Sequence, residues 1–158
     1  MRIVPLALAS IALIAAAAAG AAVTKVSGAK AAQVMHERHE GMENIGKAFK
    51  ALHREFDASS PFVPTVRSSA TQIANLSKSA SGWFPAGTGP DVGKTGAKPE
   101  IWQNQQDFAA KLTAFQKAAL VFNSAASGSD MSAAKARYAD LGGTCKACHD
   151  KYRTEMHH

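Results

Sequence analysis

The sequence lacks residues that several common functional sites require. Its 158 residues include only two cysteines, Cys145 and Cys148. A structural zinc site needs about four Cys or His ligands at matching spacing, and no second pair of that kind accompanies these two. A thioredoxin-like redox pair belongs in a βαβ pattern, but no segment alternates apolar and polar residues as a strand does. These absences argue against a zinc site and against a thioredoxin-like redox pair. A disulfide between the two cysteines is the remaining simple alternative.

Aromatic residues are also scarce, at 7% of the chain. The 18 Lys and Arg residues outnumber the 12 Asp and Glu residues, which gives a formal charge of +6. These charges are spread along the chain, and few aromatic residues interleave with them. The composition therefore argues against nucleic-acid binding.

Only the amino-terminal end carries a long apolar run. Residues 3–20 follow the positive Arg2 and end in a cluster of Ala and Gly that suits cleavage. This pattern predicts a secretory signal peptide over residues 1–22. A retained membrane anchor is the alternative, but the run is short for a span and consists mostly of alanine. We expect a periplasmic protein without an anchor, whose residues 23–158 form one domain of formal charge +5.

The two cysteines stand in the segment Cys145-Lys146-Ala147-Cys148-His149. Cysteines three residues apart, with a histidine directly after the second, are typical of c-type haem attachment. On a helix, positions i and i+3 share a face, so both thiols can reach the two vinyl groups of one porphyrin. His149 then lies close beneath the ring, where a neutral imidazole can bind iron. The motif predicts one covalently attached haem c with its iron.

The rest of the mature chain shows the periodicity of four amphipathic helices. Apolar residues recur in alternating steps of three and four, which is the pattern of a stripe that faces a bundle. Prolines mark several boundaries, because proline is favoured in the first helical turn and the residue before it avoids the helical region. The predicted helices cover residues 29–57, 63–79, 99–127 and a last segment that begins at Ser129 or Asp130.

A long loop at residues 81–98 separates the second predicted helix from the third. It holds five glycines and two prolines, which exclude a regular helix or strand. Its Trp83 and Phe84 are apolar and should pack onto the bundle or its cofactor. We therefore interpret the loop as a crossover connection.

The apolar stripe of the last helix aims both cysteines toward the centre of a bundle. Four such helices with one long connection predict an all-α fold, an antiparallel four-helix bundle. Cofactor sites in such bundles form in the core from facing helices, so we expect the haem there. The stripe consists of Ala134, Tyr138, Leu141, Cys145, Cys148 and Tyr152.

Three segments of the sequence resemble the cytochrome c′ / cytochrome c-556 family, the class II c-type cytochromes. The first is residues 145–153, which contain the haem motif. The second is Ala97-Lys98-Pro99-Glu100-Ile101-Trp102, and the third is Arg38-His39-Glu40-Gly41-Met42. The resemblance spans nearly all of the mature chain and implies a four-helix bundle with a covalent haem.

The resemblance also implies roles for individual residues. Cys145 and Cys148 would form the two thioethers, and His149 would be the proximal iron ligand. Arg38 would lie near the haem propionates, with His39 beside it, and a guanidinium suits a carboxylate partner. The other implied positions are Thr95 or Gly96 at the haem edge, Met42 facing the iron on its other side, and Arg153 near the exposed side of the ligand.

Met42 separates two versions of the site. As an iron ligand it would give a six-coordinate, low-spin iron, as in the c-556 members. As a packed core residue it would leave a five-coordinate iron behind an apolar wall, as in the c′ members. Its spacing of four from Arg38 puts both residues on one helix face, but the sequence favours neither version.

A covalent haem, an export signal and a mildly basic surface fit a one-electron carrier. That surface could steer acidic redox partner proteins in the periplasm. The alternative is a five-coordinate haem protein that binds nitric oxide or carbon monoxide. We expect no enzyme, since peroxide cleavage needs an acid–base group near the iron, whereas Met42, Ile45 and Phe49 predict an apolar wall. The family often dimerises through its first two helices, so a homodimer is a further expectation, although the faces here are charged or serine-rich.

Overall fold

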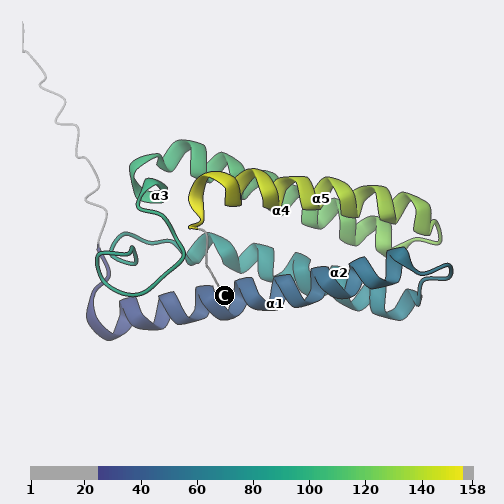
Figure 1. The fold of residues 1–158 in the computed structure, drawn as a ribbon, viewed down its shortest axis with the longest axis horizontal. Helices are drawn as coiled ribbons and strands as arrows, with labels where there is room; N and C mark the ends of the chain where they lie inside the picture. Colours follow the sequence, from purple (N-terminus) through teal and green to yellow (C-terminus); the bar gives the residue numbers. More distant parts are fainter. Residues whose placement is uncertain (1–24, 155–158) are drawn as a thin grey trace, which may run out of the picture.

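Four long helices run antiparallel as a bundle in the structure, a computed structural model that describes residues 25–154 (Figure 1). No β-strand occurs within these residues, which contain one isolated bridge between Ala97 and Arg153. The predicted all-α four-helix bundle is confirmed, whereas the predicted signal peptide lies outside the described residues. The helices are α1 (Gly28–Asp57), α2 (Val63–Ser79), η1 (Ala80–Gly82), α3 (Glu100–Gln103), α4 (Gln105–Ser127) and α5 (Met131–Tyr152).

The long helices form two layers, α1 with α2 and α4 with α5 (Figure 1). Helix α2 also packs closely on α4, but α1 and α5 are not among the closely packed pairs. Side chains bridge these two helices instead. The rings of Phe49 and Tyr138 have centroids 4.3 Å apart, and a Cβ on Gly142 would come within 3.1 Å of Phe49 Cζ. Helices α1 and α5 therefore meet through large side chains rather than through close backbone packing.

A main core cluster extends along the bundle. Each long helix contributes one of its largest fully buried side chains: Leu52, Ile73, Phe122 and Leu141. Burial of one side chain of this size contributes roughly 1.5–3 kcal/mol. The apolar stripes predicted from the sequence are thus the surfaces that hold the bundle together. None of the described helices is both long and apolar enough to cross a membrane.

The predicted third helix is interrupted. The sequence predicts one helix over residues 99–127, but the structure divides it at Asn104, whose φ of −120° and ψ of 51° leave the helical region. Its side-chain Nδ2 donates to the carbonyl oxygen of Glu100 at 3.2 Å, and such local bonds compete with helix formation. Trp102 Nε1 donates to the carbonyl oxygens of Phe84 and Pro85 at 3.1 and 3.0 Å. Helix α3 is therefore tied to the crossover loop.

The crossover loop, α3 and the carboxyl end of α5 gather at one end of the bundle (Figure 1). Lys98 N donates to Tyr152 O, and Thr154 N donates to Gly96 O, both at 2.9 Å. As predicted, Trp83 of the loop is buried in the main core, and Phe84 packs against both core clusters. A second, smaller core cluster at this end consists of Ile101, Phe108 and Tyr152.

Candidate functional site

Cys145 and Cys148 lie on α5 as free, half-buried thiols. Cys145 packs against the main core cluster, and Cys148 packs against the second cluster beside Tyr152. Burial raises the pKa of both thiols. The stripe predicted for the last helix therefore turns both cysteines toward the bundle, on the face where a haem group could join them.

His149 follows Cys148 and is exposed on α5. Partial removal from water lowers the pKa of its imidazole, the positive charge of Arg153 lowers it further, and Asp150 opposes both effects. The imidazole is therefore neutral at neutral pH, which is the form that binds iron. Arg153 comes directly after α5, one turn beyond the histidine.

Arg38 of α1 is a buried cation, only 5% exposed. Its Nη1 donates to Trp83 O at 3.1 Å and to Thr88 Oγ1 at 3.2 Å. Its Nη2 donates to Thr88 O at 2.9 Å and to Thr95 Oγ1 at 3.0 Å. Desolvation lowers the pKa of Arg38, but a guanidinium stays charged in proteins. All four acceptors are neutral and belong to the crossover loop, so Arg38 fixes the loop and keeps its charge.

The rings around Arg38 complete this arrangement. Its Cζ lies 5.2 Å from the centroid of Phe84 and 6.0 Å from that of Trp102, which is cation–π distance. Thr95, a predicted haem-edge residue, links Arg38 to the backbone at Ala97. Its hydroxyl accepts from Arg38 and also from Ala97 N at 3.1 Å. Gly96, the other predicted edge residue, binds the carboxyl end of α5 through its carbonyl oxygen. The structure thus brings Arg38 and Thr95 together and places Gly96 beside the end of α5.

Met42 lies one turn after Arg38 on α1 and is half-buried against the main core cluster, which includes Ile45. Its neighbour Gly41 is buried beneath Trp83: a Cβ there would meet the indole Cη2 and Cζ2 at 2.3 Å. Phe49 packs against the same cluster. The surroundings of Met42 are apolar, as predicted.

His39 lies at the surface, whereas the guanidinium of Arg38 is buried. Its Nε2 is 3.4 Å from Glu43 Oε1, and 60% of its side chain is exposed. His39, Glu40 and Glu43 lie close enough to hold a metal ion, but all three are exposed. The predicted place of His39 at the haem edge stays a prediction.

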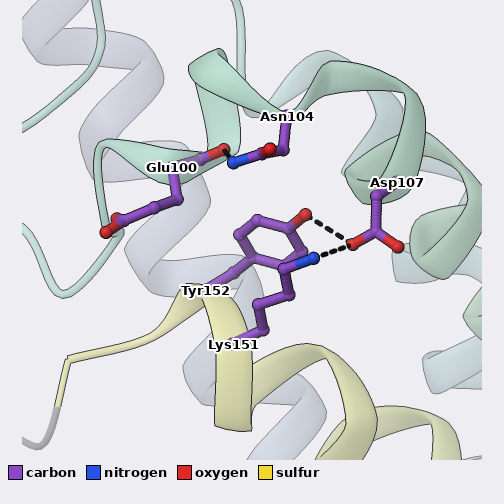
Figure 2. Close-up of polar contacts among 5 residues, drawn as sticks. All are labelled: Glu100, Asn104, Asp107, Lys151 and Tyr152. Atoms are coloured by element: carbon purple, nitrogen blue, oxygen red, sulfur yellow. Dashed lines mark hydrogen bonds and ion pairs between the residues drawn. The ribbon is translucent and has the colours of Figure 1, made fainter.

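Sequence reasoning missed Asp107, Thr88 and the contact of Gly41 with Trp83. Asp107 lies in the first turn of α4 and accepts hydrogen bonds from Tyr152 and Lys151 of α5 (Figure 2). These residues come together only through the fold, and no motif spacing links them. Of the residues in this contact, only Tyr152 could be predicted from the sequence to be buried, since it belongs to the apolar stripe of the last helix.

The residues present fit a haem. Arg38 and Met42 lie on α1 and both cysteines lie on α5, and these two helices are not among the closely packed pairs. The thiols are free and half-buried. Within residues 25–154, Arg38 has no carboxylate partner, and a haem propionate is a carboxylate that it could bind.

The model of the family described as Cytochrome C′ matches residues 33–153. The chain belongs to the cytochrome c′ family. It is 34% identical over 113 residues to cytochrome c-556 from Agrobacterium tumefaciens, covering 71% of this chain and 89% of that protein. The structure of cytochrome c prime from Shewanella frigidimarina matches with a TM-score of 0.74 and 32% identity, over 82% of this chain and 100% of that one.

A further solved relative is the nitric oxide complex of a variant of cytochrome c prime from Alcaligenes xylosoxidans. It matches with a TM-score of 0.72 and 26% identity, over 82% of this chain and 100% of that one. Some curated relatives are matched over less than two thirds of their own length.

As a member of this family the protein carries a covalently attached haem c, as predicted. Cys145 and Cys148 provide the only thiols of the chain. The individual roles of His149 and Met42 at the iron stay predictions.

Proposed function

We propose that the protein is an exported, periplasmic one-electron carrier whose haem is held by Cys145, Cys148 and His149. The haem iron supplies the change between two oxidation states. The observation that carries the proposal is the position of these residues on α5: the cysteines are half-buried and His149 is exposed. A redox partner can therefore approach the haem-bearing segment from solvent.

The surroundings of Met42 support a carrier rather than an enzyme. Ile45 and Phe49 are apolar neighbours of Met42 on α1, and neither can exchange a proton with a bound substrate. The nearest histidine along that helix, His39, is exposed and paired with Glu43. These residues suit electron transfer, which needs no proton donor at the iron.

A second candidate function is the binding of nitric oxide or carbon monoxide to a five-coordinate iron. It is favoured by the packing of Met42 against the main core cluster, which can keep its sulfur away from the iron. The nitric oxide complex of a relative at 26% identity supports the same candidate.

Optical spectra of the purified protein separate the two functions. A sharp reduced α band that carbon monoxide does not change would mean that Met42 binds the iron, and would exclude gas binding. A broad high-spin spectrum that shifts with carbon monoxide would remove Met42 as a ligand and favour the second candidate. Met42→Leu is the control, because it should convert the first spectrum into the second and leave the second nearly unchanged.

The attachment is tested separately. Cys145→Ala and Cys148→Ala should each weaken covalent retention of haem during extraction with acid and acetone. A double variant that keeps its haem through this extraction would contradict the proposed attachment. His149→Ala should change the iron spectrum while the thioethers persist.

A further inference from the structure

Tyr152 holds the last turn of α5 in three ways. Its side chain is buried, with 2% exposed, and its ring stands edge-on to Phe108 with centroids 5.2 Å apart. Its carbonyl oxygen accepts from Lys98 N at 2.9 Å. Its hydroxyl donates to Asp107 Oδ2 at 2.6 Å (Figure 2). One tyrosine therefore connects the end of α5 to α4 and to Lys98 at the end of the crossover loop.

Asp107 is well suited to accept this bond. It lies in the first turn of α4, where the helix dipole favours a carboxylate. The same Oδ2 accepts from Lys151 Nζ at 2.9 Å, so two consecutive residues of α5 converge on one oxygen (Figure 2). The hydrogen bond from Tyr152, followed by that from Lys151, lowers the pKa of Asp107. The bond is therefore charge-assisted, and such bonds are stronger than neutral ones.

His149 lies in the same turn of α5. Arg153 N donates to His149 O at 3.1 Å, so the residues after Tyr152 also hold the histidine backbone. Its imidazole is exposed and has no hydrogen-bond partner among residues 25–154. Metal-binding histidines usually have their second nitrogen held by a partner that orients the ring. Here the orientation of the ring depends on the helical turn.

We propose that Asp107 and Tyr152 are positioning residues for His149, which fix the last turn of α5 and thereby orient the imidazole at the haem iron. The inference rests on the proposed role of His149 as iron ligand. Tyr152 also packs in the cluster that contacts Cys148. If the turn loosens, the thioethers still hold the haem, while the imidazole gains freedom to rotate.

Tyr152→Phe tests the proposal because it removes the hydroxyl and keeps the ring. Tyr138→Phe is the matched control: Tyr138 is the only other tyrosine and lies on the same helix, but its hydroxyl makes only a long 3.4 Å contact with Phe49 O. The haem-loaded, oxidised proteins are compared by the hyperfine-shifted haem methyl resonances in their NMR spectra. We expect a changed spread of these shifts in Tyr152→Phe, because the spread depends on the orientation of the axial imidazole, and no change in Tyr138→Phe.

Asp107→Asn weakens the same hydrogen bond by removing the charge of its acceptor. It should change the spread of the haem methyl shifts in the same way, and it tests the proposal even if Tyr152→Phe does not yield folded protein. The double variant should add little, since groups that act as a pair are not additive. Hydrogen–deuterium exchange over residues 149–154 of the loaded protein should also become on the order of tenfold faster. Unchanged resonances in both Tyr152→Phe and Asp107→Asn, or an equal change in Tyr138→Phe, would overturn the proposal. Resonances unaffected by His149→Ala would instead disprove the ligand role on which it rests.

Discussion

The Arg38 guanidinium and the Thr95 hydroxyl are 3.0 Å apart, although 57 positions separate them in the sequence. Arg38 lies on α1, and Thr95 lies in the crossover loop just before Gly96, whose carbonyl oxygen accepts from Thr154 N beyond α5. One buried cation thus connects the first helix to the loop, and the loop connects to the haem-bearing helix. The loop is therefore part of the site rather than a linker.

Replacement of Arg38 should destabilise the protein and release the loop. Arg38→Met removes the donors for the carbonyl oxygens of Trp83 and Thr88, and a buried polar group left unpaired costs about 1–3 kcal/mol. We expect the free energy of unfolding in urea to fall by roughly 3 kcal/mol. Arg54→Met, at an exposed position of the same helix, should change it little. An equal loss in both variants would contradict the role of the buried hydrogen bonds.

Gly41 and Gly46 lie on the same helix and should respond to alanine in opposite ways. A Cβ on Gly46 would meet no atom within 4 Å, whereas a Cβ on Gly41 would come within 2.3 Å of Trp83. Gly46→Ala should stabilise the protein by about 0.5–1 kcal/mol through helix propensity. Gly41→Ala should be less stable than Gly46→Ala by about 1–3 kcal/mol, the cost of overpacking. Thermal unfolding measures both, and equal stability would mean that Trp83 moves freely.

The bundle could be predicted from the sequence because its signals are local and repeated. Prolines fix helix starts, and the stripes of apolar residues identify the buried faces, including the one that holds both cysteines. The interruption at Asn104 could not be predicted in this way. It accompanies the hydrogen bond from the Asn104 side chain to Glu100 O. It also accompanies the hydrogen bonds of Trp102 to loop carbonyl oxygens 17 and 18 positions away, and the periodicity of apolar residues reveals neither.

In the candidate site, too, the features with a local sequence signal could be predicted, and those that depend on distant contacts could not. Cys145, Cys148 and His149 follow from a five-residue motif whose spacing carries the chemistry. The surroundings of Arg38 depend on partners 45 to 57 positions away, so its contacts with Trp83 and Thr88 needed the fold. Asp107 was missed for the same reason.

Trp102 should control how readily the crossover loop opens. Its indole N–H is the donor for two loop carbonyl oxygens, and Trp102→Phe removes that donor while keeping an aromatic ring. A loss of about 1.4 kcal/mol would raise the population of the opened loop tenfold. We expect trypsin to cleave after the exposed Lys94 about tenfold faster in this variant. Circular dichroism at the same temperature checks that the bundle stays folded, and cleavage at the wild-type rate would mean that other contacts hold the loop.

The Asp107 carboxylate should make stability depend on acid pH. The hydrogen bonds from Tyr152 and Lys151 lower its pKa in the folded protein, so the unfolded chain binds a proton more readily than the folded one. The stabilisation is therefore complete above the ordinary aspartate pKa of about 3.9 and is lost as the pH falls through the lower, folded value. Asp107→Asn should be less stable than the wild type at pH 7, and the difference should shrink steadily below about pH 4. Urea unfolding at a series of pH values measures this, with Asp140→Asn on α5 as the control for removing one negative charge. A difference that stays constant down to the acid limit would show that the bonds survive protonation of Asp107, and the carboxylate would then hold the end of α5 by geometry rather than by charge.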